Sequence, residues 1–259
     1  MGQCLYSRIL SMSGGGSDFE KVTQSGSVPL RRKYYCICEG PTEESYFWGV
    51  RNNRAELNIK NDVHIEIIPK EEGQESYSHP MQLVNACLSA MGRIDKDGNA
   101  LLQEEWEKNC KWDDFDSERD AACIIFDRDY KNLEQYLDEI FRLCQKNHIR
   151  IVMSNPNFEL WLLMHFPDIS QYKQDDLLEN KKNRKKERFP DASVHKKCLE
   201  ILVAKHAQGY KKGRGLSFER FLPHIDLAVQ QAKLFCEDER KICDYLGTAA
   251  GKLIQDMRS

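Results

Sequence analysis

YYCICEGPTEESYFWGV, residues 34–50, is the stretch that decides the fold of this chain. A short apolar run ends at Glu39, and a Pro-Thr pair then starts a segment with two acidic residues followed by aromatic ones. This order predicts a buried strand over residues 34–39, a tight turn, and a helix over residues 42–53 with Thr42 as its N-cap. The turn therefore places carboxylates at the carboxyl end of a strand, where open α/β sheets bind ligands.

A second stretch, AACIIFDRD at residues 121–129, repeats this pattern, because an apolar strand runs into Asp127 and is followed by Asp129. Side chains alternate along a strand, so Asp127 and Asp129 lie on the same side if the strand continues between them. Glu39 then meets this Asp-x-Asp pair at one edge of the sheet, and Glu43, one turn into its helix, faces the same cleft. Such hard oxygen ligands suit Mg²⁺, and two ions about 4 Å apart hold both reacting oxygens of a phosphodiester.

Each of these carboxylates also has a purely structural interpretation, which the sequence leaves open. Glu43 and its neighbour complement the positive end of a helix dipole. Asp129 caps the helix that follows, and Asp127 is held by Arg128 or by turn amides. This interpretation weakens when two strand ends converge, because several carboxylates packed together destabilise the fold unless a cation joins them.

Glu159 interrupts the strongly apolar stretch NFELWLLMHF at residues 157–166. A buried Glu requires a partner. Two interpretations stay open: Glu159 is a catalytic group that binds the metal or positions the reactants, or it forms a salt bridge with a Lys or Arg of the segment that follows.

Charge is unevenly distributed along the 259 residues, whose net charge is −3. Residues 1–170 hold 19 Lys and Arg against 28 Asp and Glu, whereas residues 171–220 hold 14 against 7. An acidic body followed by a basic block is typical of a metal site beside a phosphate-binding arm, and equally of a solvated Lys-rich surface. The candidate nucleic-acid-binding residues lie in GYKKGRG at residues 209–215 and are Lys211, Lys212 and Arg214, with Tyr210 as a candidate for stacking on a base.

Several classes of protein are disfavoured by what the sequence lacks. Ten cysteines are scattered without a CxxC pair, which indicates free thiols in a reducing cytoplasm. No apolar run approaches the ~20 residues of a membrane span. The Walker motif and GxGxxG are absent, so no nucleotide-cradling loop is predicted.

The apolar periodicity predicts how the chain is organised. Further strands are expected over residues 63–69 and 149–153, with helices over residues 80–92, 133–147 and 157–166. The alternation of strands and helices predicts an α/β fold with a parallel sheet flanked by helices.

Three regions follow from this pattern and from composition. The expected regions are a disordered Ser/Gly-rich tail at residues 1–29, an α/β domain at residues 30–166 with a polar insertion at about 93–120, and a helical basic C-terminal region at residues 167–259 with closing helices over 216–234 and 236–257.

Three motifs together resemble the RloB-like proteins: CEGPTEESYF at residues 38–47, IIFDRD at 124–129 and SNPNFELWLLMHF at 154–166. The segment at residues 210–233 resembles the C-terminal segment of that family. The family is similar to Toprim-fold proteins, in which a Glu after the first strand and a DxD after the third bind Mg²⁺. Carried over to this sequence, the resemblance implies Glu39, Asp127 and Asp129 as metal ligands.

A similarity to Toprim nucleases of the OLD type implies Glu43 as a ligand of a second ion. The resemblance implies an endonuclease that depends on Mg²⁺, with Mn²⁺ as a second usable ion, and that cleaves DNA or RNA, tRNA included. It also implies a role in prokaryotic anti-phage defence or abortive infection, beside an ATPase partner. The alternative is a catalytically silent module of a defence complex that binds nucleic acid or an ATPase.

Overall fold

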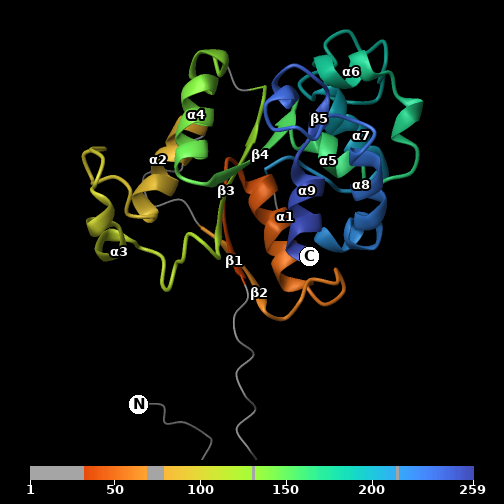
Figure 1. The fold of residues 1–259 in the computed structure, drawn as a ribbon. Coiled ribbons are helices and arrows are strands. Elements are labelled where there is room, and N and C mark those ends of the chain that lie inside the picture. The colour runs from red at the N-terminus through yellow and green to blue at the C-terminus, as the bar shows by residue number, and fades with distance from the viewer. Residues whose placement is uncertain (1–31, 69–78, 130–131, 214–215) are drawn as a thin grey trace, which may run out of the picture.

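The computed structural model describes residues 32–68, 79–129, 132–213 and 216–259, so the predicted tail at residues 1–29 lies outside the described part. Within these residues a five-stranded sheet runs through the molecule in the order β2-β1-β3-β4-β5 (Figure 1). Its strands are β1 (Arg32–Cys38), β2 (Val63–Ile67), β3 (Ala121–Asp127), β4 (Ile149–Asn155) and β5 (Gly247–Thr248).

The first four strands are parallel, and β5 alone pairs antiparallel, with Ser154 of β4 opposite Thr248. Every residue of the central strand β3 is buried, as expected for a parallel strand covered on both faces. The chain therefore has the predicted α/β fold with a mostly parallel sheet. Because β1, β3 and β4 run in the same direction, their carboxyl ends meet at one edge of the sheet.

Helices cover both faces of the sheet (Figure 1). α2 (Pro80–Ala90) and α4 (Glu134–Lys146) lie on one face, and α1 (Pro41–Asn52) and α9 (Ala250–Arg258) lie on the other. Only one side of α4 is buried, through Ile140, Phe141 and Cys144, which fits the amphipathic helix that the sequence predicts.

The remaining helices are short and follow β4, apart from α3 in the predicted insertion. They are α3 (Trp106–Asn109), α5 (Glu159–Leu163), α6 (Gln174–Glu179), α7 (Cys198–His206) and α8 (Ile225–Ala232), with 3-10 turns at Gln103–Glu105, Ile169–Gln171, Phe218–Arg220, Leu222–His224 and Lys241–Cys243. The insertion is anchored on the sheet by Trp112, whose ring stacks on Tyr35 at 4.3 Å between centroids.

The two closing helices predicted over residues 216–234 and 236–257 are wrong in extent. Pro223 lies in a 3-10 turn, and the regular helix α8 begins only after it. In the second segment Gly247 belongs to β5, where a Cβ would stand 1.9 Å from the carbonyl oxygen of Cys236. Strand pairing at the sheet edge and this close approach therefore override helix propensity, and α9 is confined to the end of the segment.

The C-terminal region completes the sheet, because β5 extends it and α9 packs on β4. Asp256 of α9 accepts hydrogen bonds from Tyr34 of β1 and from Arg150 of β4. The division of the chain at residue 166 stays a prediction.

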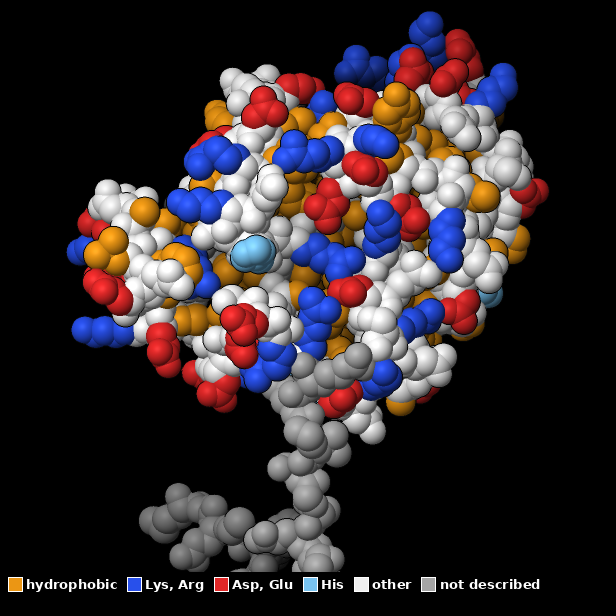
Figure 2. All heavy atoms as spheres, in the orientation of Figure 1, with side chains coloured by type: hydrophobic (Ala, Val, Ile, Leu, Met, Phe, Trp, Pro, Cys, Tyr) orange, Lys and Arg blue, Asp and Glu red, His pale blue; other side chains and the backbone are white. Residues whose placement is uncertain are grey.

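The described surface is of mixed charge. Figure 2 shows Lys and Arg side chains at the top right of this face, over the region of α6 in Figure 1, with acidic side chains between them. Among the described residues, no helix combines the length and the apolar character that crossing a membrane requires. The cysteines in the described part are free thiols, most of them buried.

Candidate active site

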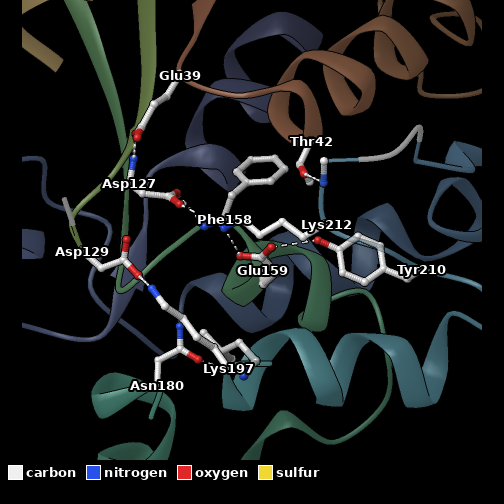
Figure 3. A network of polar contacts seen from close by, with 12 residues as sticks. Glu39, Thr42, Asp127, Asp129, Phe158, Glu159, Asn180, Lys197, Tyr210 and Lys212 are labelled. Carbon is white, nitrogen blue, oxygen red and sulfur yellow. Dashed lines mark hydrogen bonds and ion pairs between the residues drawn. The ribbon is translucent and has the colours of Figure 1, made fainter. Parts of the chain in front are cut away.

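The ends of β1 and β3 bring the first two predicted ligands together. These strands are neighbours in register, and the Glu39 amide continues their ladder by donating to the carbonyl of Ile125 at 2.8 Å. Glu39 turns its carboxylate across to β3, where Oε2 accepts a hydrogen bond from the Asp127 amide at 2.7 Å (Figure 3). The convergence of two strand ends that the sequence predicts is therefore present.

Glu43 lies one turn into α1 and is only 4% exposed. Its Oε2 lies over Gly40, at 2.9 Å from the position that a Cβ at Gly40 would take. A larger residue at position 40 would push this carboxylate away, so the glycine before the helix makes room for it. Glu43 therefore points back toward the end of β1, as predicted.

Asp127 is the last residue of β3 and is 7% exposed. Its Oδ1 accepts a hydrogen bond from the Phe158 amide at 2.8 Å, and its Oδ2 lies 3.7 Å from the ammonium of Lys212. A backbone amide from the start of α5 thus fixes one carboxylate oxygen, while the other faces a cation.

Glu159 joins this cluster, with 1% of its side chain exposed. Oε1 accepts a hydrogen bond from the Tyr210 hydroxyl at 2.8 Å, and Oε2 lies 3.1 Å from Lys212 Nζ (Figure 3). The salt bridge to the basic block that the sequence offered as one interpretation is therefore present. Because the same lysine reaches Asp127, this salt bridge also places Glu159 beside the candidate site.

Asp129 lies differently from the arrangement that strand alternation gives. β3 ends at Asp127, and the next two residues form a turn in which the Asp129 amide donates to the Pro156 carbonyl at 3.0 Å. The condition for a shared strand face therefore fails. The Asp129 carboxylate forms an ion pair with Lys197, the N-cap residue of α7 (Figure 3).

The candidate nucleic-acid-binding segment at residues 209–215 is described only up to Gly213. Lys211 is exposed, Lys212 turns inward onto the carboxylates, and Arg214 lies outside the described residues. Gly213 fastens the loop to α1, because its amide donates to Thr42 Oγ1 at 3.2 Å. Tyr210 is buried, so the predicted stacking on a base does not fit this arrangement.

An aromatic cluster holds α1 and α5 at fixed positions. Tyr46 contacts Phe158 and Trp161 edge-on, and its hydroxyl lies 3.0 Å from His165 Nε2. Desolvation lowers the pKa of His165 to about 3, so this buried ring is neutral and structural. The cluster thereby fixes the two helices that carry the acidic side chains at positions 43 and 159.

Two carboxylates of the site, those of Glu39 and Asp127, are disfavoured in their ionised form. Burial raises the pKa of Glu39 to about 7, since the hydrogen bond from the Asp127 amide offsets it only in part and Glu43 adds repulsion. Burial, with repulsion from Glu43, also raises the pKa of Asp127 well above its ordinary value. For Lys212, burial alone lowers the pKa, but attraction to Glu159, Asp127 and Glu43 together outweighs it, and the pKa is raised.

The donor set has the chemistry that a divalent cation requires. Carboxylate oxygens are the hard ligands of Mg²⁺, and a cation would offset the burial and the repulsion that raise the pKa of Glu39. Across the described residues, no three His, Cys, Asp or Glu side chains are grouped as ligands. One oxygen of Glu39 binds the Asp127 amide and one oxygen of Asp127 faces Lys212, so both carboxylates have partners within the protein.

Two members of this constellation were not predicted. Lys197 binds Asp129 from 68 positions along the chain, and the Phe158 amide binds Asp127. The NPNFEL sequence indicates a turn before a helix, which makes a free amide near Phe158 predictable. Nothing in the sequence distinguishes Lys197 from the other lysines of the basic block.

A family model for RloB-like proteins matches residues 34–257 of this chain. No curated protein matches the chain, and no solved structure matches it either. The match covers all three motifs on which the sequence resemblance was based, together with β5 and most of α9.

Proposed function

The chain belongs to the RloB-like family, and we propose that it is a metal-dependent endonuclease that hydrolyses the phosphodiester backbone of DNA or RNA, tRNA included. The observation that carries the proposal is the meeting of Glu39 and Asp127 at the ends of two neighbouring parallel strands. Burial and repulsion disfavour the charge of both carboxylates, and a divalent cation would compensate it.

In this proposal Glu39, Glu43, Asp127 and Asp129 hold Mg²⁺, or Mn²⁺ in its place. A bound ion supplies positive charge for phosphate oxygens and makes a water molecule more acidic. The Phe158 amide keeps one oxygen of Asp127 oriented.

Lys212 has two partners in the described arrangement and a third in the proposal. It forms ion pairs with Glu159 and Asp127, and the Tyr210 hydroxyl holds Glu159 in place. With Asp127 engaged by an ion, the Lys212 ammonium would be available to a phosphate oxygen, which is the role that the sequence predicts for it. Glu159 then acts as a positioning residue, because it keeps Lys212 at the edge of the site.

The setting that we propose is the cytoplasm of a prokaryotic cell, in anti-phage defence beside an ATPase partner. Support comes from family membership and from the free thiols of the described part.

A catalytically silent module that binds nucleic acid or an ATPase is the second candidate. One observation favours it: Lys212 already neutralises Glu159 and lies beside Asp127, so an internal cation takes the place that an ion would need. In this candidate the carboxylates stabilise the loop that carries Lys212, and no chemistry takes place there.

Incubation with plasmid, single-stranded DNA and total RNA, in Mg²⁺, Mn²⁺ or EDTA, separates the two candidates. The wild type is compared with Glu39→Ala and Asp127→Ala, and with Glu104→Ala in the exposed part of the insertion as a matched control. The nuclease proposal predicts metal-dependent products with the wild type and the control, and none with the two site variants. Binding without cleavage, in every metal and with every variant, would favour the silent module.

A further inference from the structure

The basic block divides into two parts in the structure. Lys197 and Lys212 form ion pairs with carboxylates of the candidate site. Residues 181–188, KKNRKKER, instead form an irregular exposed segment between α6 and α7, which we call the basic loop. Its charges are therefore directed outward.

A buried asparagine fixes the basic loop. Asn183 is 8% exposed, and its Nδ2 donates to the carbonyl oxygens of Phe189 at 2.7 Å and of Ala192 at 3.2 Å. Its backbone amide donates to the carbonyl of Lys196 at 3.0 Å. The residues on either side of Asn183 are exposed, so a fixed backbone presents their side chains to solvent.

The loop holds six Lys and Arg residues against one acidic residue, Glu187, and in the described part its middle forms no ion pair. Across the described residues, no ion pair includes Lys182, Arg184 or Lys185, whereas the two ends of the loop pair with Glu179 and Asp176. Like charges held close together repel one another, and a polyanion relieves that repulsion. The middle of the loop thus favours an anionic partner, while its ends stabilise the fold.

The basic loop borders two adjoining pockets of about 470 Å³ each, which share Arg188 and Phe189. The guanidinium of Arg188 lies 5.3 Å from the centroid of the Phe189 ring, and the ammonium of Lys205 lies 4.7 Å from it. Basic side chains thus line both pockets around one aromatic ring. Figure 2 shows Lys and Arg side chains, with acidic ones between them, on the outer surface over α6, the helix that precedes this loop.

The loop is also tied to the candidate active site. Lys182 forms an antiparallel bridge with Lys197, and the Cys198 amide donates to the carbonyl of Lys181 at 3.1 Å. The side chain of Lys197 in turn binds Asp129, just beyond the end of β3. One short backbone ladder therefore connects the outward cations to the edge of the sheet where the carboxylates lie.

We propose that the basic loop binds the phosphodiester backbone of the nucleic acid and guides it to the carboxylate site. This inference rests on the proposed nuclease function, and it assigns substrate binding to residues other than the loop at 209–215. A polyanion fits better than a single phosphate, because the cations are spread over two pockets. The contacts are with the backbone, so the affinity depends strongly on salt and weakly on sequence.

The test is a binding titration in EDTA, in which no metal-dependent cleavage takes place. Fluorescent single-stranded DNA, duplex DNA and RNA of equal length are titrated at several salt concentrations. The variant is Lys182→Gln, Arg184→Gln and Lys185→Gln combined. The matched control is Lys233→Gln, Lys241→Gln and Lys252→Gln combined, which removes as many exposed charges from elements outside both pockets.

We expect the loop variant to lose roughly 10-fold in affinity and its slope of log K against log salt to shrink by about 2 to 3, whereas the control keeps the wild-type slope. An unchanged slope in the loop variant, or an equal loss in both variants, would overturn the proposal. Selective binding of phosphatidylserine vesicles in place of nucleic acid would overturn it too. Binding is measured in EDTA, where no metal-dependent cleavage takes place, so a failure of loop binding is read separately from a failure of the nuclease proposal.

Discussion

Strand β3 has an aspartate at each end, and the two differ in how their charge is compensated. Asp120 directly precedes the strand, and its side chain is fully buried. It accepts two hydrogen bonds from Arg119 at 2.9 and 3.0 Å, and one each from the amides of Lys33 and Asp116. Burial alone raises the pKa of Asp120, but these hydrogen bonds outweigh it, and the pKa lies below its ordinary value.

Asp127, at the other end, is almost equally buried but is surrounded by like charges. Burial and the charges of Glu43, Glu39 and Glu159 raise its pKa, and attraction to Lys212 opposes them only in part. Asp120 therefore stabilises the fold as an anion, whereas Asp127 costs stability as an anion unless a cation is present. Burial alone does not separate a structural carboxylate from a candidate catalytic one. The two are separated by the groups around them, which are hydrogen-bond donors at Asp120 and other carboxylates at Asp127.

The largest expected effect is a difference between two matched substitutions in the sign of their change in the free energy of unfolding. Asp120→Asn should lower the free energy of unfolding by about 2–3 kcal/mol, because the new amide group faces the donors of Asp116 and Arg119. Asp127→Asn should leave stability unchanged or raise it in EDTA at pH 7, since it removes a repelled charge and keeps an acceptor for Phe158. Urea denaturation measures both, and equal losses would refute the contrast.

The second effect is a dependence of stability on pH at Glu39. The folded-state pKa of about 7 exceeds the ordinary 4.5, so the folded state binds the proton more tightly. The stabilisation of the folded state by the proton on Glu39 is fully present below pH 4.5 and is lost as the pH rises through 7. Glu39→Gln should therefore gain up to about 3 kcal/mol over the wild type at pH 8 and little at pH 4.5. Denaturation curves in EDTA at the two pH values, with Glu104→Gln as control, test it, and a constant difference would contradict the assignment.

A smaller effect is expected at the internal cation. Lys212→Met leaves Glu159 with Tyr210 alone, which should cost about 1–3 kcal/mol at pH 7. This loss of stability is smaller than that expected for a fully buried pair, because 44% of the Lys212 side chain is exposed. Lys211→Met, one position earlier and exposed, should change stability little. Addition of Mg²⁺ should restore part of the loss, and the absence of any recovery would count against an ion among these carboxylates.

The smallest effect is expected at the ion pair between Asp129 and Lys197. Both side chains are partly exposed, so Lys197→Gln should change stability by less than about 1 kcal/mol. Because the substitution frees Asp129, it should raise the apparent Mg²⁺ affinity severalfold in a thermal-shift titration. Lys196→Gln, which removes a comparable surface pair with Glu200, is the control. Equal Mg²⁺ affinity in both variants would mean that Asp129 does not hold the ion.

Much of the sheet and part of the site could be predicted from the sequence. The apolar runs that end in Glu39 and Asp127 are short and bounded by turns, and parallel strands place their carboxyl ends at one edge. The meeting of these two side chains follows from that rule alone. Glu159 was also identifiable, because a single charge in an apolar helix requires a partner.

Other parts depend on contacts that carry no local signal. β3 ends at Asp127 because the Asp129 amide binds the carbonyl of Pro156, which lies beyond the end of β4, and no periodicity marks that point. The two-residue strand β5 is too short to show alternation, and it is recognisable only once Gly247 is seen against Cys236. The inward turn of Lys212 also depends on the tertiary position of Glu159.

Cleavage by wild type, Asp127→Asn and Asp120→Asn tests the central claim most directly. The three proteins are incubated with the same nucleic acid in Mg²⁺ and in EDTA, at a temperature where circular dichroism shows all three folded. We predict Mg²⁺-dependent products from the wild type and from Asp120→Asn, and a loss of at least about 100-fold with Asp127→Asn. Full activity of Asp127→Asn, or no activity of folded Asp120→Asn, would contradict the assignment of chemistry to the carboxyl end of β3.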